Sequence, residues 1–247
     1  MKAAPEAQLR LLDLQELDTT LDRLAHRRRT IPEFAEIAKV EERLGGVADA
    51  LVAAQTEISD IDREQKKAEQ DVDQVRARAE RDQKRLDSGQ VSSARDLENL
   101  QSEIVSLHKR QSDLEEIVLE VMERCEEAEN RLRAVETDKE AADKELAELA
   151  ERRDAASQEI DGQAELTRTA RAGVGGDIPD DLLKLYEKLR EQHRGVAAAA
   201  LLRGQCQGCH LQLNTVELNA IRTAAKDEVL RCEECRRILV RTPESGL

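Results

Sequence analysis

Apolar side chains recur in alternating steps of three and four residues along much of this chain. From Ile37 to Leu86, thirteen of the fifteen positions on this repeat are apolar, and only Gln65 and Asp82 interrupt it. The residues between these positions are largely charged. A repeat that averages 3.5 residues is typical of a helix that buries one narrow stripe, here called the seam, against a partner helix. The pattern therefore predicts a long coiled-coil helix.

The same repeat returns between Leu97 and Ala170, with more interruptions toward its end. Between the two repeats lie residues 88–93, which contain one glycine and three serines. These residue types end one helix and cap the next. The segments on either side, 5–87 and 94–172, contain 83 and 79 residues. Two arms of nearly equal length around one turn predict an antiparallel helical hairpin.

A proline interrupts the first arm. Pro32 lacks a backbone donor and should end or kink a helix at this point. The leucines between residues 14 and 24 also run out of phase with Ile37. We therefore expect one helix over 5–30, a kink near residue 32, and a second helix over 32–87.

The composition argues against a compact enzyme fold and against a membrane protein. Charged residues make up 37% of the chain and aromatic residues 1%. No apolar run approaches the roughly 20 residues needed to span a bilayer, and the N-terminus does not resemble a signal peptide. We expect a cytoplasmic protein that does not bind membranes, in which the cysteines are thiols or metal ligands rather than disulfides.

Three glycines between residues 173 and 176 predict the end of the hairpin, because glycine disfavours a helix interior. Pro179 and the acidic pair Asp180 and Asp181 then indicate a new helix start. We expect a hairpin domain over 1–172, a flexible joint over 173–178, and a C-terminal domain over 179–247 that begins with this helix. On this interpretation the hairpin folds independently of the C-terminal domain.

Four of the five cysteines form two CxxC pairs, with 22 residues between the pairs. Each CxxC turn brings two sulfurs to one side, and two such turns make the tetrahedral thiolate site that zinc prefers. A redox CxxC and a chance spacing are the alternatives; the redox motif needs a strand–helix setting that nothing here predicts. Four thiolates leave no open coordination position, which argues against catalytic zinc. We expect one structural zinc ion held by Cys206, Cys209, Cys232 and Cys235.

The flanks of the cysteine pairs fit a small ribbon with short strands and one helix. Residues 197–203, 229–231 and 238–240 can be extended, and Asn214 and Glu217 have the spacing of a capping pair for a helix over 214–225. About 50 residues cannot bury enough surface to fold alone. The metal therefore has to supply the deficit, on the order of 10 kcal/mol.

Three other features allow a functional and a structural interpretation. Cys125 falls on the seam, where a thiol that fills space is favoured over a reactive cysteine. His210 could replace a neighbouring cysteine as a ligand, but four cysteines already complete the site. The arginine run 27–29 could bind phosphate or form a charged helix face, and the second is favoured.

Charge divides the chain unevenly. Residues 1–179 have a net charge of −15, and residues 180–247 have a net charge of +1. An acidic body repels nucleic acid, so any phosphate contact should come from arginines near the cysteines. No aromatic residue lies in the ribbon for base stacking, so a sequence-specific reader of single strands is not expected. The candidate phosphate-binding residues are Arg203, Arg231, Arg236, Arg237 and Arg241.

The chain resembles a bacterial family of coiled-coil proteins with a C-terminal C4-type zinc ribbon. The resemblance covers essentially the full length. The family usually has a glycine after the last cysteine, where this chain has Arg236. The resemblance implies a non-enzymatic, regulatory protein that binds nucleic acid or protein partners. The matching segments are Leu11–Asp18, Ala94–Ile104, Leu114–Glu123, Leu183–Arg190, both CxxC pairs and Arg237–Leu239.

Two functions follow as hypotheses for this mainly α chain. The first is nucleic-acid binding through the basic residues around the ribbon. The alternative is a protein adaptor or chaperone-like scaffold, with the acidic hairpin as partner surface and the ribbon as docking head. An enzyme with a small-molecule substrate is not expected, because the sequence contains no nucleophile–base pair, phosphate loop or open metal site.

Overall fold

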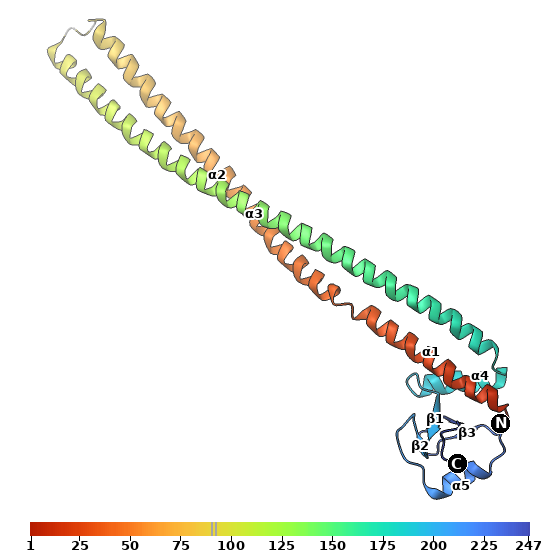
Figure 1. Ribbon diagram of the computed structural model, residues 1–247. Coiled ribbons are helices and arrows are strands. Elements are labelled where there is room, and N and C mark those ends of the chain that lie inside the picture. The colour runs from red at the N-terminus through yellow and green to blue at the C-terminus, as the bar shows by residue number, and fades with distance from the viewer. Residues whose placement is uncertain (90, 92) are drawn as a thin grey trace. The chain divides into compact units, whose positions relative to one another are not determined.

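The computed structural model describes residues 1–89, 91 and 93–247, and within them the chain forms five helices and four short strands (Figure 1). The predicted fold class, a long helical hairpin followed by a small ribbon, is confirmed. Contacts divide the chain into two compact units, Met1–Phe34 with Glu151–Leu247, and Ala35–Ala150. The predicted turn at 88–93 includes Gln90 and Ser92, which lie outside the described residues.

The unit Ala35–Ala150 is a pair of antiparallel helices, formed by α2 (Glu33–Asp87) and α3 (Ala94–Gly176). All fifteen predicted seam positions from Ile37 to Leu86 are buried or half-buried. Ile61 packs against Val121 and Ala128 of α3. The 3–4 repeat therefore identified the buried stripe of α2 residue by residue.

Three of the ion pairs between the two helices share one register, whereas Arg76–Glu115 and Arg78–Glu103 are offset from it. In Arg43–Glu145, Glu57–Arg131 and Glu64–Arg124 the two residue numbers add to the same value, as a single antiparallel alignment requires. Each partner is about half exposed, so each pair contributes roughly 0.2–1 kcal/mol. The apolar seam therefore supplies most of the stability of this helix pair.

The other unit begins with α1 (Pro5–Arg29), and the chain leaves the helix before Pro32 and enters α2 at Glu33. Leu24 and Ile31 pack against Ile160 and Ala164 of α3. On the 3–4 repeat that begins at Leu97, Gln163 and Thr167 are seam positions; Gln163 is exposed and Ala164 is buried in its place, while Thr167 is half-buried. The partner of α3 in this unit is α1 rather than α2.

The predicted glycine joint at 173–178 is wrong, because α3 continues through Gly176. Val174 packs on the core of this unit, and Ile178 is only 3% exposed there. This packing outweighs the roughly 1 kcal/mol that each glycine costs a helix. The segment after residue 172 is therefore held in place by its neighbours.

The ribbon is a four-stranded sheet in the order β2-β1-β4-β3, in which only β1 and β4 are parallel. The strands are β1 (Ala198–Leu202), β2 (Gln205–Cys206), β3 (Leu230–Arg231) and β4 (Ile238–Arg241). The helix α5 (Thr215–Thr223) begins with the predicted capping box, since Asn214 and Glu217 exchange hydrogen bonds of 2.9 and 3.0 Å.

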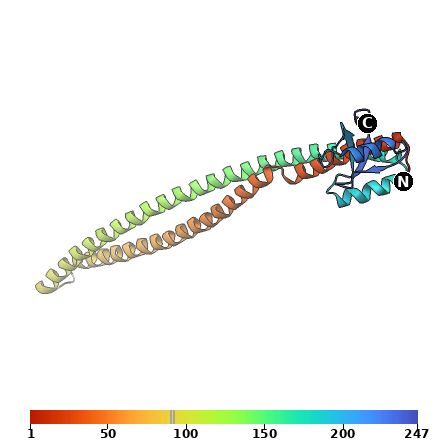
Figure 2. The ribbon, with the colours of Figure 1, turned by 90° about the horizontal axis from the view of Figure 1, so that it is seen from below.

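Both faces of this sheet are buried. Ile238 and Val240 of β4 pack on a core with α1 and α4 (Asp180–Gln192), while Leu239 packs toward α5 and the cysteines. The N-terminus lies beside the ribbon (Figure 2), and the Ala3 amide donates to the Asp227 carbonyl at 2.7 Å. The ribbon therefore shares a core with α1, contrary to the expectation that hairpin and ribbon fold separately.

The hydropathy of the described helices can be compared with the sequence, which contains no long apolar run. Among the helices that the structure describes, none is long and apolar enough to cross a membrane.

Candidate metal centre

The two CxxC segments form turns with the same hydrogen bonds. The His210 amide donates to the Cys206 carbonyl at 2.8 Å, and the Arg236 amide donates to the Cys232 carbonyl at 2.9 Å. The amide of the first cysteine in each pair donates to the carbonyl five residues later, at 3.0 Å in both turns. Each turn therefore presents its two sulfurs to the same side.

The four sulfurs gather as the spacing predicted, all within 4.8 Å of one another. The Cys206 and Cys235 sulfurs lie 3.8 Å apart, and the Cys209 and Cys232 sulfurs lie 3.9 Å apart. A tetrahedral site with Zn–S bonds of about 2.3 Å requires sulfurs about 3.8 Å apart. The cysteines of this C4-type ribbon therefore fit one zinc ion. When bound, zinc would cross-link the two turns.

The protein surroundings both oppose and favour the thiolate form that zinc needs. Burial raises the pKa of Cys206 to about 12, against the hydrogen bonds that its sulfur accepts from the Gly208 and Cys209 amides. Burial also raises the pKa of Cys232. Although burial acts in the same direction on Cys235, hydrogen bonds from Arg237 lower its pKa. Because the ligand form is the thiolate, zinc binding has to offset the effect of burial on Cys206.

The residue after each second cysteine has a left-handed backbone, with φ of 59° at His210 and 61° at Arg236. This conformation suits glycine and costs other residues roughly 1–2 kcal/mol. The turn thus explains the glycine that the family usually has at the position of Arg236. The side chains at both positions are exposed, and His210 lies outside the ligand cluster.

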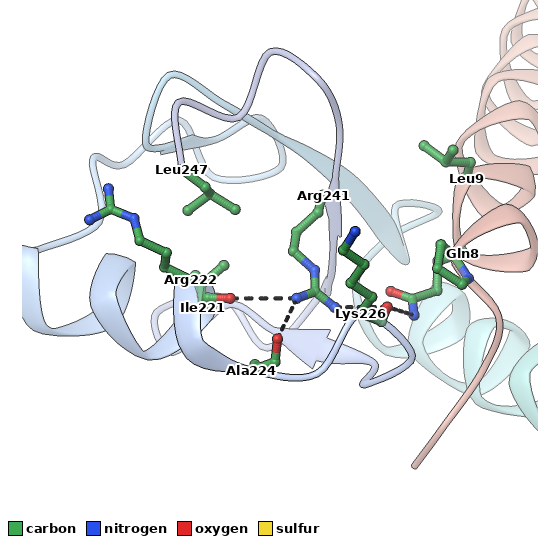
Figure 3. A pocket seen from close by; sticks show the side chains of 9 residues that line it. Gln8, Leu9, Ile221, Arg222, Ala224, Lys226, Arg241 and Leu247 are labelled. Carbon is green, nitrogen blue, oxygen red and sulfur yellow. Dashed lines mark hydrogen bonds between the residues drawn. The ribbon is translucent and has the colours of Figure 1, made fainter.

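Two of the five predicted phosphate-binding arginines donate hydrogen bonds within the ribbon. Arg237 donates to the carbonyls of Val196 at 2.9 Å and Gly208 at 3.0 Å. Arg241 donates to the Ala224 carbonyl at 3.1 Å (Figure 3) and to the Ala225 carbonyl at 2.7 Å. Both side chains therefore contribute to the packing of the ribbon. The other three predicted residues, Arg203, Arg231 and Arg236, are exposed.

A pocket of about 290 Å³ lies beside Arg241, between the start of α1 and α5 (Figure 3). Leu9, Ile221 and Leu247 give it an apolar wall, and Arg222 and Lys226 lie among its lining residues. The lining contains no carboxylate, histidine or cysteine.

Sequence reasoning missed a buried polar network in the same unit. The Asp18 carboxylate, 1% exposed, accepts hydrogen bonds from Arg171 at 2.5 Å and from the Tyr186 hydroxyl at 2.8 Å. Arg190 lies 3.4 Å from the same carboxylate. Gln15 accepts from the Ala197 amide at 2.7 Å. The network thus ties α1 to α3, to α4 and to the residue before β1.

The network shifts the pKa values of its members in consistent directions. The hydrogen bond to Asp18 raises the pKa of Arg171. Burial, followed by the hydrogen bond to Asp18, raises the pKa of Tyr186. Two features of the sequence could have indicated this network: the chain's single tyrosine and the polar residues on the inner face of α1. A search for catalytic or metal-binding motifs considers neither.

Comparison with known proteins matches this architecture along nearly the whole chain. Residues 14–194 match the model of the CT398-like coiled coil hairpin domain, and residues 205–239 match the C4-type zinc ribbon domain. Two Mycobacterium tuberculosis relatives, the uncharacterized proteins MT2288 and Rv2229c, are 35% identical over 242 residues, which is 98% of each chain.

Solved structures agree with these matches. A structure from Mycobacterium smegmatis is 35% identical, with a TM-score of 0.83 over 98% of this chain and 100% of that one. CT398 from Chlamydia trachomatis is 18% identical, with a TM-score of 0.66 over 96% of this chain and 98% of that one, and shows the same fold.

Proposed function

Because the chain belongs to the family with a CT398-like coiled-coil hairpin domain and a C4-type zinc ribbon, we propose that it is a non-enzymatic scaffold whose hairpin binds a protein partner. One observation carries this proposal. The unit 35–150 has 31 acidic and 18 basic residues, a net charge of −13. Large apolar side chains nevertheless stand exposed on it, including Leu119 at 59% and Met122 at 48%.

A solvated coiled coil does not need such side chains outside its seam. Grouped apolar residues on a charged surface mark protein interaction sites, and a net charge of −13 repels nucleic acid. In this proposal the ribbon supports α1 and α4, since its sheet packs against both. The zinc ion then stabilises the scaffold by linking the two cysteine turns of the ribbon.

Photo-crosslinking in cells tests the scaffold function directly. With p-benzoylphenylalanine in place of Leu119, we expect discrete protein adducts that survive nuclease treatment. The same residue in place of Glu140, which is exposed on α3, is the control and should give none. Adducts that form only from position 236 on the ribbon, and disappear with nuclease, would contradict the scaffold in favour of nucleic acid.

Nucleic-acid binding is the second candidate, favoured by the exposure of Arg203 and Arg236. Among the residues that the structure describes, neither guanidinium has a hydrogen-bond or ion-pair partner. If these side chains bind phosphate, Arg203→Ala with Arg236→Ala should flatten the dependence of log affinity on log salt by about two units, one per lost contact. A salt titration with DNA and RNA measures this slope.

The matched control is Arg81→Ala with Arg95→Ala, which removes the same charge from exposed positions on the hairpin. It should leave the slope unchanged. Equal slopes in the two double variants would show that the ribbon arginines do not contact phosphate. Arg237 is unsuitable for this test, because its loss would also disturb the first cysteine turn.

A further inference from the structure

Two hollows between α2 and α3 meet at Leu119, with volumes of about 320 and 440 Å³. Leu119 and Met122, one turn apart on α3, are 59% and 48% exposed. Both lie outside the seam, whose positions here are Val118, Val121 and Cys125. The hairpin therefore does not need them for its own packing. Together with Val72 and Val118, they form the apolar part of what we call the hairpin groove.

Carboxylates surround this apolar strip. The only cation that lines the two hollows, Arg76, lies 3.4 Å from Asp73 and 3.4 Å from Glu115, so its charge is already compensated. Within the described part of the chain, Glu123 and Glu126 have no cation at ion-pair distance. The lining carboxylates are Glu69, Asp73, Glu115, Glu123, Glu126 and Glu129.

We propose that the hairpin groove binds a basic amphipathic helix of a partner protein, an inference that rests on the scaffold function. Lysines or arginines of such a helix would face the carboxylates, and its apolar residues at i, i+3, i+4 and i+7 would cover Leu119 and Met122. On α3 the groove extends from Glu115 to Glu129, which is about 21 Å and matches roughly 14 helical residues. A second copy of this chain is a poor occupant, since its own groove is equally acidic.

The probe is a synthetic 16-residue peptide with leucines at helical spacing and lysines elsewhere, labelled for fluorescence anisotropy against the full chain. Leu119→Gln with Met122→Gln should weaken binding at least about tenfold, because two apolar contacts are lost. Glu123→Gln with Glu126→Gln should weaken it about threefold at low salt and much less at high salt, where charges are screened.

Two controls separate groove binding from general attraction to an acidic helix. Val52→Gln with Val105→Gln removes apolar side chains that are 63% and 70% exposed elsewhere on the hairpin, and should change the affinity less than about twofold. A scrambled peptide of the same composition should bind weakly and lose its binding at high salt. Circular dichroism of each variant should show the helical content of the unaltered chain.

Equal affinity for the scrambled and helical peptides, or unchanged affinity in Leu119→Gln with Met122→Gln, would overturn the groove. These outcomes differ from failure of the scaffold function. Protein adducts at position 119 to a segment that is not basic would leave the scaffold intact and refute the basic helix. Absence of protein adducts from the hairpin would refute both.

Discussion

Cys206→Ser with Cys232→Ser should reduce bound zinc from about one ion per chain to almost none, because each cysteine turn loses a ligand. Structural zinc contributes on the order of 10 kcal/mol to small domains. The cysteine turns and α5 should therefore unfold and become sensitive to protease. Elemental analysis and limited proteolysis measure the two effects, and full zinc retention in the double variant would refute the assignment of the ligands.

The same variant should lose only part of its helical signal. Of the helical residues that the structure describes, α2 and α3 contain 138 of 185. We expect at least the far-UV signal of α2 and α3 to remain. The signal that is lost comes from α5 and from α1 and α4, because α1 and α4 share a core with the sheet. Cys125→Ser is the control and should keep both zinc and helicity, since Cys125 lies on the hairpin seam.

Asp18→Ala should destabilise the unit that contains the ribbon by about 3–5 kcal/mol, the usual cost of removing one partner from a buried ion pair. The substitution leaves Arg171, Arg190 and the Tyr186 hydroxyl around an empty acceptor position. Urea unfolding followed by tyrosine fluorescence measures the loss. The signal is specific because Tyr186 is the only tyrosine and the chain has no tryptophan.

Asp13→Ala provides the matched control on the same helix. Asp13 is 56% exposed and pairs only with Arg10 at 3.4 Å, so its loss should cost less than about 0.5 kcal/mol. A similar midpoint shift for both variants would mean that the buried network does not stabilise this unit. An unchanged midpoint for Asp18→Ala would mean that water replaces the carboxylate without penalty.

Prediction from sequence succeeded where the information is local. The seam of α2 depends on a repeat within one helix, and the cysteine turns depend on spacings of three residues. The same reasoning failed at residues 173–176, where local glycine propensity was outweighed by the packing of Val174 and Ile178. It also did not predict that Arg237 and Arg241 donate to backbone carbonyls, because charge in a sequence does not show which groups a side chain contacts.

The sequence by itself determined that the chain is a helical hairpin with a four-cysteine ribbon. Apolar periodicity and the spacing of metal ligands are local patterns, so both can be recognised without knowing which segments of the chain are in contact. Only the tertiary structure decided which distant residues meet and which side chains remain exposed. Asp18 meets Arg171 across 153 residues of sequence, and the ribbon meets α1 from the opposite end of the chain. Leu119 and Met122 stand exposed beside carboxylates because the hairpin places Val118, Val121 and Cys125 on its seam and needs neither side chain there.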